Sequence, residues 1–473
     1  MKPFMLRPLT RSNWLKAHLY LALSTGFFFA LIGLTGSISL YREEIDGLLN
    51  PQLIIENPQG KYQSLDKIMA SVHAAHPTRY GSWTLEMPSS PQGMITAWYE
   101  KPTETFFELY APLMVSVNPY TSDVVMTRFW GKTFTTWLLD LHTQFRLARF
   151  GWNAVGILGA LLFISCASGL YLWWPGVKAI NQVLKIRHKA GMMLFAFDIH
   201  RSLGLINATA LLLLAFTGFF LSYPILLDTF TGSSGMEHGQ TGRAITSTAI
   251  PNNHPTGLQA ASFIAQGAFR KAKLRRLSTP AGDTGVYRIN LRQAGEINQR
   301  HPFTTVWVDR WSGQVKEVRN PNKFTLGETF ASWIWPLHTG EAIGKNGKFF
   351  LFLAGLSLFM LYVSGLIRWL CRIGLVRDRK VSFKTIHYLL SRLSKITKYT
   401  LLKSYILIRL LTQSLFNFFM KAYIISLIWI KKIHLLVINN QKHPKKNNYL
   451  FFHYGSKEKK INLLFLLRNL FQR

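Results

Sequence analysis

Four apolar runs constrain how this chain of 473 residues can fold, because each is long enough to cross a lipid bilayer. The hydrocarbon core of a bilayer is about 30 Å thick, and a helix needs roughly 20 apolar residues to span it. The runs occupy residues 17–41, 152–174, 203–223 and 347–370. We therefore predict a membrane α-helical protein, a four-span bundle in which two long polar segments separate the spans.

Basic residues predict which ends of the spans face the cytoplasm. They gather before the first span, between the second and third, and after the fourth: Lys2, Arg7, Arg11, Lys16, Lys178, Lys185, Arg187, Lys189, Arg368, Arg372, Arg377 and Arg379. These sides are cytoplasmic by the positive-inside rule, so residues 42–140 and 224–337 are expected outside. The first span is followed by YREEID instead of a small-residue cleavage site, which predicts an uncleaved anchor.

The spans and their flanks repeat. The segments Trp137–Gly169 and Trp333–Gly365 both contain Leu-His-Thr followed by an apolar run that ends in Ser-Gly. In both, 26 residues separate the histidine from the serine, and two other histidines each precede a Thr-Gly by 17 residues. Such fixed spacing indicates a duplicated two-helix unit.

The repeat sets four histidines in corresponding places: His18, His142, His200 and His338. His18 and His200 begin helices that run outward, so we expect them at the cytoplasmic end of the bundle. His142 and His338 precede helices that run inward and are expected at the outer end. The 17 residues from His18 to its Thr-Gly rise about 26 Å in a helix, which separates the two pairs by nearly one membrane thickness.

Each outer segment has the pattern of a small α+β module. In the first, SLDKIMASVHAAHP predicts a helix, and GSWTLEM, GMITAWYE, TFFELYA and VNPYTSDVVMTR predict strands and a turn. In the second, LQAASFIAQGAF predicts a helix, and VYRINLR, TTVWVDR and VDRWSGQVKEVR predict strands and the equivalent turn. The helix of the first module would bury Leu65, Ile68, Met69 and Val72 on one face.

The turns and the motifs LTG, LHT, SGLYLWWP and LHTGE make residues 10–380 similar to the PepSY-associated transmembrane family, with two external PepSY-like modules. Members of that family include iron-regulated inner-membrane proteins and ferric-siderophore reductases that bind b-type haem through membrane histidines. The resemblance implies a multi-pass protein of the bacterial inner (cytoplasmic) membrane with both soluble segments periplasmic. Because haem iron in electron-transfer proteins takes two axial side chains, we predict that His18 with His200, and His142 with His338, ligate two b haems.

The predicted organisation has six parts. They are residues 1–41 (N-terminus and span 1), 42–140 (first external module), 141–223 (spans 2 and 3 with a basic cytoplasmic loop), 224–337 (second external module), 338–380 (outer histidine motif and span 4) and 381–473 (a basic Lys/Asn/Ile-rich tail). The tail is either a set of basic helices on the anionic inner leaflet or a composition-biased, non-native extension, and a further span within 411–430 is an alternative. The only cysteines, Cys166 and Cys371, lie in or next to spans, so the outer segments are expected to fold without disulfides.

Three functions fit these features. The first is a dihaem oxidoreductase that carries electrons from a cytoplasmic or quinol donor to a periplasmic acceptor, which the resemblance implies is a ferric siderophore, for iron acquisition. The second is a non-redox membrane-anchored protein whose PepSY modules bind or regulate a peptidase, and the third is a quinol-linked cytochrome with a protein partner. The net charge of +33 would suggest nucleic acid in a soluble protein, but much of it lies in the tail, and we expect the lipid bilayer rather than nucleic acid as partner.

Several residues near the histidines allow two interpretations. Gly36, Gly169, Gly218 and Gly365 either serve plain helix packing or leave room for a porphyrin face. Arg146, Arg149 and Glu341 either pair with haem propionates and steer an anionic ligand or are solvated interfacial charges. His188 is an alternative ligand for the cytoplasmic haem, but it has no counterpart in the other half of the repeat. The histidines of the outer modules are expected at the surface.

Overall fold

The computed structural model describes residues 10–174, 176–187, 190–233, 245–250 and 252–378, and the backbone of 449–454 and 457–462. Residues Met1–Val381 form one compact unit and Ser382–Arg473 a second. In the second unit β9 (Tyr449–Tyr454) pairs antiparallel with β10 (Lys457–Asn462). The further span considered within 411–430 lies outside the described residues.

Four helices of the first unit are long and apolar enough to cross a membrane, which identifies a membrane protein. They are α1 (Arg11–Ser39), α5 (Ala148–Trp173), α7 (Met192–Ser222) and α11 (Gly344–Arg372). The four predicted runs coincide with these helices, although α7 begins about three turns earlier. His18 and His200 therefore lie inside α1 and α7, past the first turn, rather than at the helix start.

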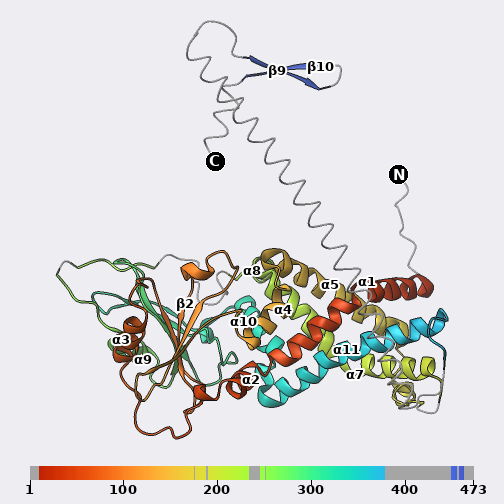
Figure 1. Ribbon diagram of the computed structural model, residues 1–473, viewed down its shortest axis with the longest axis horizontal. Coiled ribbons are helices and arrows are strands. Elements are labelled where there is room, and N and C mark those ends of the chain that lie inside the picture. The colour runs from red at the N-terminus through yellow and green to blue at the C-terminus, as the bar shows by residue number, and fades with distance from the viewer. Residues whose placement is uncertain are drawn as a thin grey trace. The chain divides into compact units, whose positions relative to one another are not determined.

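The four helices pack side by side in the cyclic order α1, α11, α7, α5, so α1 lies diagonally opposite α7 (Figure 1). The contact between α1 and α11 is close because two glycines meet there. A Cβ added to Gly33 would lie 2.6 Å from the carbonyl oxygen of Gly355. One turn further, the hydroxyl of Ser37 donates to the carbonyl of Phe352 at 2.9 Å. Small residues thus let the backbones approach, as in other membrane helix pairs.

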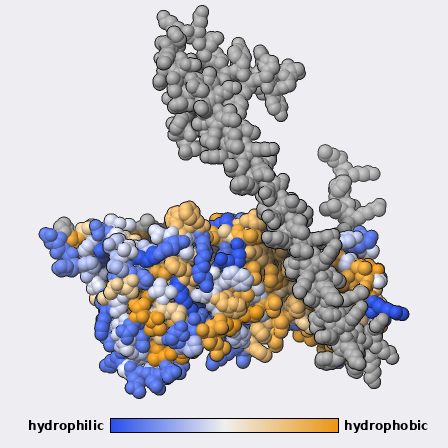
Figure 2. Space-filling model, in the orientation of Figure 1, coloured by the Kyte–Doolittle hydropathy of each residue, from blue (hydrophilic) through white to orange (hydrophobic). Residues whose placement is uncertain are grey.

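Large apolar side chains remain exposed on the outside of the bundle. Figure 2 shows hydrophobic surface over the helices and mainly hydrophilic surface over the sheet. The exposed side chains include Phe27, Phe150, Ile157, Phe163 and Phe349. An apolar surface of this extent is stable only against lipid or another protein, which agrees with a bundle that lies in a bilayer.

The two outer segments together form one eight-stranded antiparallel sheet in the order β4-β3-β2-β1-β5-β6-β7-β8. The strands are β1 (Thr84–Glu86), β2 (Ile95–Tyr99), β3 (Leu113–Val117), β4 (Val124–Phe129), β5 (Lys273–Ser278), β6 (Val286–Arg292), β7 (Thr305–Asp309) and β8 (Val315–Arg319). The segments join where β1 pairs with β5, with Leu85 opposite Leu277. The two predicted modules therefore share a single sheet.

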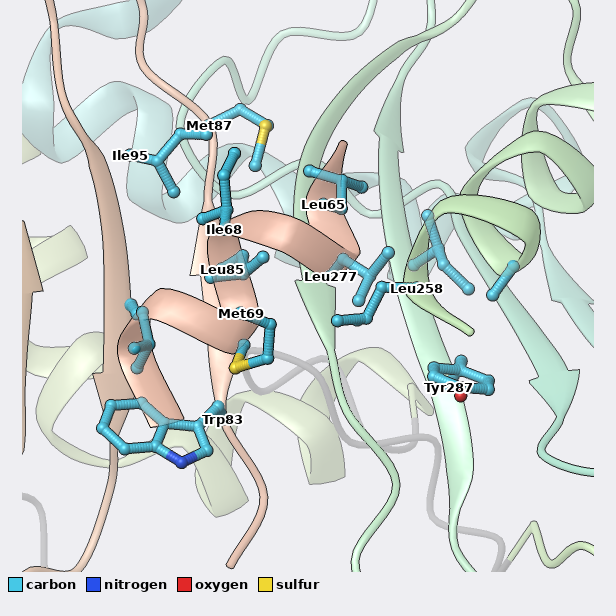
Figure 3. Packing of buried hydrophobic residues seen from close by; sticks show 14 of the residues in the cluster. Leu65, Ile68, Met69, Trp83, Leu85, Met87, Ile95, Leu258, Leu277 and Tyr287 are labelled. Atoms are coloured by element: carbon cyan, nitrogen blue, oxygen red, sulfur yellow. The ribbon is translucent and has the colours of Figure 1, made fainter. Parts of the chain in front are cut away.

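One core also serves both segments. Helices α3 (Leu65–Ala75) and α9 (Leu258–Ala268) contribute to the same buried cluster as both central strands, and Figure 3 shows their side chains meeting over Leu85 and Leu277. The four apolar residues predicted for the face of α3 are all buried. Hydrophobic burial across the β1–β5 boundary thus stabilises the sheet as a whole.

The strand prediction was wrong at one place and incomplete at another. The segment TFFELYA is not a strand; it begins at the last residue of the short 3-10 helix η2 (Thr103–Thr105), and Phe106 and Phe107 are exposed in the loop that follows. Strand β5 was not predicted, because its sequence KLRRLS carries three cations in six residues. Its arginines point to the face away from the core, where Arg276 pairs with Glu86 of β1 at 2.8 Å.

Short helices connect the sheet to the bundle. They are α2 (Arg42–Leu49), α4 (Phe134–Gln144), α8 (Pro224–Thr231) and α10 (Leu326–Thr339), whereas α6 (Ile180–Val183) lies in the connection between α5 and α7. Arg128 of β4 pairs with Asp46 of α2 at 2.9 Å, and the indole N–H of Trp130 donates to Asp140 of α4 at 2.9 Å. These charged and buried bonds fix the sheet against one end of the bundle.

Candidate functional site

Two helix breaks position the histidines nearest the sheet. Helix α4 ends at Gln144, and Phe145 and Arg146 then take left-handed φ values of 48° and 59° before α5 begins. Helix α10 ends at Thr339, and the next residue, Gly340, has a left-handed φ of 79°. The Leu-His-Thr segments therefore lie on separate short helices that are not continuous with the spans. Each short helix packs back against the bundle.

The four histidines meet in two pairs, each between opposite corners of the bundle. The ring centres of His18 on α1 and His200 on α7 are 6.3 Å apart, and those of His142 on α4 and His338 on α10 are 6.2 Å apart. We call His142 and His338 the sheet-side pair and His18 and His200 the far-end pair. These are the pairings expected from the direction of the helices.

Each histidine packs against the glycine of a Ser-Gly or Thr-Gly motif on a neighbouring helix. A Cβ at Gly36 would lie 2.6 Å from Cε1 of His142. Equivalent Cβ atoms at the other three glycines would lie 3.2–3.4 Å from a histidine: Gly218 from His338, Gly169 from His18 and Gly365 from His200. The space that these glycines leave is thus filled by imidazole, which neither predicted interpretation of the glycines had included.

The same motifs bind the Nδ1 atoms of the rings. Nδ1 of His142 lies 2.9 Å from the carbonyl oxygen of Ile32, and Nδ1 of His200 lies 2.9 Å from that of Leu361. A carbonyl can only accept, so both rings must carry their proton on Nδ1. The carbonyls come from one turn before Gly36 and Gly365.

Hydroxyl groups hold the other two rings. Nδ1 of His18 lies 3.0 Å from Oγ of Ser168, and Nδ1 of His338 lies 2.9 Å from Oγ1 of Thr217. Each hydroxyl donates its own proton to a backbone carbonyl of its helix, at 2.9 Å and 2.7 Å. Its lone pairs are then left to accept N–H from the ring.

All four imidazoles therefore have the lone pair on Nε2, and no hydrogen bond to that atom is present among the residues that the structure describes. Burial, with a smaller contribution from neighbouring His142, lowers the pKa of His338 to about 3, and burial likewise lowers the pKa of His142. A neutral imidazole whose N–H is bound by a second group is the form that ligates metals, and the bound N–H sets its orientation. The donor set fits metal ligation at both pairs.

The spacing of the rings also fits one metal ion per pair. A metal–imidazole bond is about 2.0–2.1 Å long and the ring centre lies about 1.1 Å beyond the nitrogen, so two imidazoles on opposite sides of one ion place their centres about 6.2–6.4 Å apart. Both observed separations, 6.3 and 6.2 Å, agree with this value. Among the residues that the structure describes, no cluster of three or more His, Cys, Asp or Glu forms a metal site, so each pair offers two protein ligands.

A cavity of about 960 Å³ lies between the sheet-side pair and the sheet. Its volume is at the upper end of the range for small-molecule and cofactor sites. The wall formed by the helices contains His142, His338 and the adjacent Gly36 and Gly218, with apolar side chains around them. The sheet contributes charged side chains to the opposite wall, so the cavity is apolar near the histidines and polar near the sheet.

Basic residues outnumber acidic ones in the polar part of the cavity. The basic ones are Arg42, Lys273, Arg275, Arg292, Arg300, Lys345 and Lys348, and the acidic ones are Glu43, Asp228 and Glu341. Burial and the nearby Arg300 lower the pKa of Arg42 to about 10. Repulsion between the guanidinium groups of Arg42 and Arg300 costs free energy, and a negatively charged ligand would reduce that cost. This wall is therefore suited to an anion.

The sequence model of one family, described as the PepSY-associated TM region, matches residues 15–372. The chain belongs to this family. The match includes the four spans, both histidine pairs and the sheet between the spans. No curated protein matches the sequence.

Other residues singled out in this PepSY-associated protein lie apart from the two pairs. Arg146 pairs with Asp140 at 2.6 Å, and Arg149 is exposed. Glu341 lines the cavity and accepts from the backbone N–H of Gln299 at 3.1 Å. His188 lies outside the described residues.

The hydrogen-bonding role of Ser168, Thr217 and Ser364 was missed in the sequence. The signal was present, because each precedes the glycine of a repeated motif, but the motif contacts a histidine of a different helix. The basic wall was also missed. Its residues come from α2, β5, β6, α11 and the segment after β6, and no local pattern links them.

Proposed function

We propose that this membrane protein carries electrons across a bacterial inner membrane through two b-type haems and reduces a ferric siderophore in its sheet-side cavity for iron acquisition. The observation that carries the proposal is the pair of neighbouring histidines at each end of the bundle, with ring centres 6.3 and 6.2 Å apart and with Nδ1 of every ring in a hydrogen bond. His18 and His200 would hold one haem, and His142 and His338 the other. Bound haem supplies one-electron transfer at a potential set by its ligands and surroundings.

The chain's own residues supply orientation, separation and access. The carbonyls and hydroxyls at Nδ1 hold each ring in the tautomer that ligates, which raises its strength as a ligand. Along α1, 18 residues separate His18 from Gly36, the contact of His142, so the levels of the two pairs differ by about 27 Å. That difference would connect a cytoplasmic or quinol donor at one membrane face with the cavity at the other.

Because His142 and His338 would hold the haem, a ferric complex would bind beside the sheet-side pair, in the cavity. One electron converts its Fe(III) to Fe(II) without transfer of an atom. Fe(II) is held less tightly than Fe(III) by hard oxygen ligands and is then released. Lys and Arg gather at the end of the bundle away from the sheet, which favours a cytoplasmic location for that end and supports the proposal of a periplasmic cavity.

The equivalent contacts of the two halves support a duplicated two-helix unit and its PepSY-like module. In each half a histidine of the first helix packs against the Ser-Gly of the second, and a Leu-His-Thr histidine packs against the Thr-Gly of the first. Each half also supplies one helix and four strands to the sheet.

The test is a dithionite-reduced minus oxidised absorption spectrum of the purified full-length chain, with haem per chain measured alongside. We expect a low-spin b-type spectrum and two haems, and the loss of one haem in His338→Ala and of the other in His200→Ala. His254→Ala, which changes an exposed histidine of the outer segment, is the matched control. Unchanged haem content in both bundle variants would refute the assignment.

The alternatives give different results in the same preparation. A colourless protein after expression with ample haem would favour a peptidase-binding PepSY protein. A haem protein whose reduced form is reoxidised by no ferric chelate, but by a protein acceptor, would favour a quinol-linked cytochrome.

A further inference from the structure

The charged wall of the cavity carries more positive charge than its own acids can balance. Seven basic side chains line the cavity against three acidic ones. We call the seven residues the basic vestibule: Arg42, Lys273, Arg275, Arg292, Arg300, Lys345 and Lys348. They lie on several separate elements that meet only in the folded chain.

The three acids are already engaged. Glu43 pairs with Arg300. Asp228 accepts the hydroxyl proton of Ser233 at 2.8 Å, and Glu341 accepts the N–H of Gln299 at 3.1 Å. Lys348 pairs with Glu44, which lies outside the lining, at 2.7 Å. The other five basic residues of the vestibule form no ion pair in the described part of the chain.

Three arginines of the vestibule, Arg42, Arg275 and Arg292, form no ion pair in the described part of the chain, and Arg275 donates to the backbone carbonyls of Met87 and Pro88 at 3.1 Å. Arg42 lies with its guanidinium over the ring of Trp130, 5.4 Å from the ring centre, and forms no ion pair there. Arg292, at the end of β6, forms none either, and its Nε is buried without a hydrogen-bond partner among the described residues. The carboxylates of Glu43 and Glu86 attract Arg42 but form no ion pair with it. A buried cation that is only partly compensated costs free energy, so this arrangement is stabilised when an anion enters.

We propose that the basic vestibule selects the acceptor by charge, and that this chain takes ferric chelates whose oxygen ligands carry a net negative charge, such as catecholates, in preference to neutral hydroxamates. This inference rests on the proposed function and names the substrate class for its sheet-side site. Two haem propionates would balance only part of the excess charge, which leaves the rest for the chelate. Arg42 and Arg292 are the specificity-determining residues, because a planar guanidinium donates two parallel hydrogen bonds to adjacent oxygens.

The test uses gallium in place of iron, so that binding is measured without electron transfer. Triply anionic Ga(III)–tris(catecholate) and neutral Ga(III)–tris(acetohydroxamate) are titrated calorimetrically into the full-length chain in detergent. We expect the anionic complex to bind at least about tenfold more tightly, with an affinity that falls as salt is added. Equal affinity for the two complexes would overturn the proposal.

Variants assign the selectivity to the two arginines. Arg42→Gln/Arg292→Gln should weaken binding of the anionic complex by about tenfold or more and leave the neutral complex unchanged. Lys101→Gln/Lys271→Gln removes the same charge from exposed positions outside the cavity and should change neither. Arg42→Lys/Arg292→Lys keeps the charge but loses the paired hydrogen bonds, so its affinity should lie between those of the unchanged chain and of Arg42→Gln/Arg292→Gln, which separates loss of charge from misfolding.

Haem content separates the failure of this proposal from that of the proposed function. A chain that binds the anionic complex but contains no haem keeps the vestibule and refutes the electron-transfer function. A chain with two haems that does not distinguish the complexes refutes the vestibule alone. Loss of haem from Arg42→Gln/Arg292→Gln would assign the arginines to the propionates and overturn the proposal.

Discussion

Gly36→Ala is the substitution that most directly tests how the sheet-side pair is held. The new Cβ would lie 2.6 Å from Cε1 and 2.9 Å from Nδ1 of His142. Carbon atoms make favourable contact at about 3.5–4.0 Å, so the ring must withdraw by about 1 Å. The hydrogen bond from Nδ1 to the carbonyl of Ile32, now 2.9 Å long, would then exceed bonding distance.

The free energy of the change can be worked out from these contacts. In a helix interior, alanine is otherwise more stable than glycine by about 1 kcal/mol. Overpacking costs about 1–3 kcal/mol and the lost hydrogen bond about 1 kcal/mol. We therefore expect a net loss of about 1–3 kcal/mol in the free energy of unfolding, together with loss of haem from the sheet-side pair.

The assay combines thermal unfolding followed by circular dichroism with haem per chain. Gly204→Ala is the control, because its Cβ would meet only Cδ2 of Leu361, at 3.7 Å, and it should be neutral or stabilising. Gly365→Ala, with its nearest atoms at 3.4 Å, should fall between the two. A Gly36→Ala protein that unfolds no earlier than Gly204→Ala and keeps all its haem would refute this account of the site.

Three further predictions concern the hydrogen bonds, the core and the charges. Ser168→Ala removes the hydroxyl that contacts Nδ1 of His18, and it should weaken haem retention about tenfold in a competition assay with apomyoglobin. Ser364→Ala should have a smaller effect, because Nδ1 of His200 keeps its hydrogen bond to the carbonyl of Leu361 at 2.9 Å. Leu277→Ala, at a fully buried position of β5, should lower the unfolding free energy by about 2–5 kcal/mol in a denaturant titration. Burial opposes ionisation of Asp309, but the N–H groups of the turn after β7 bind its carboxylate and hold its pKa at about 2. The ionised carboxylate should therefore stabilise the folded chain by about 2 kcal/mol. This stabilisation should be complete above pH 4 and lost as the pH falls towards 2. Asp309→Asn should remove that part of the pH dependence of the unfolding temperature.

Much of the membrane part could be predicted from the sequence, because lipid imposes length and apolarity on each span. The fixed spacing of His18 and His200 from their Thr-Gly motifs indicated which ends of the bundle they share. The helix breaks after α4 and α10 could not be predicted in the same way. The left-handed φ at Phe145 has no local sequence signal, since it is stabilised by packing of α4 against the bundle.

The sheet shows the same limit for long-range pairing. The helix α3 was predicted correctly because its buried residues recur at helical spacing. Strand β5 was missed because successive side chains of a strand point to opposite faces, and the side chains on one face of β5 are basic. What makes it a strand is its pairing with β1 and β6, and β1 lies far away in the sequence.

The joint between β1 and β5 has a consequence for how the chain is made. Thr84 and Ser278, which face each other across the joint, are 194 residues apart. At 5–20 residues per second a ribosome needs about 10–40 s to reach the second after the first, and two membrane spans must be inserted in that interval. During this time the first half of the sheet has an open edge, and an open edge can pair with another chain. The edge strand β1 is only three residues long, from Thr84 to Glu86, and ends in a carboxylate, so the nascent half-sheet offers little for an unrelated strand to extend.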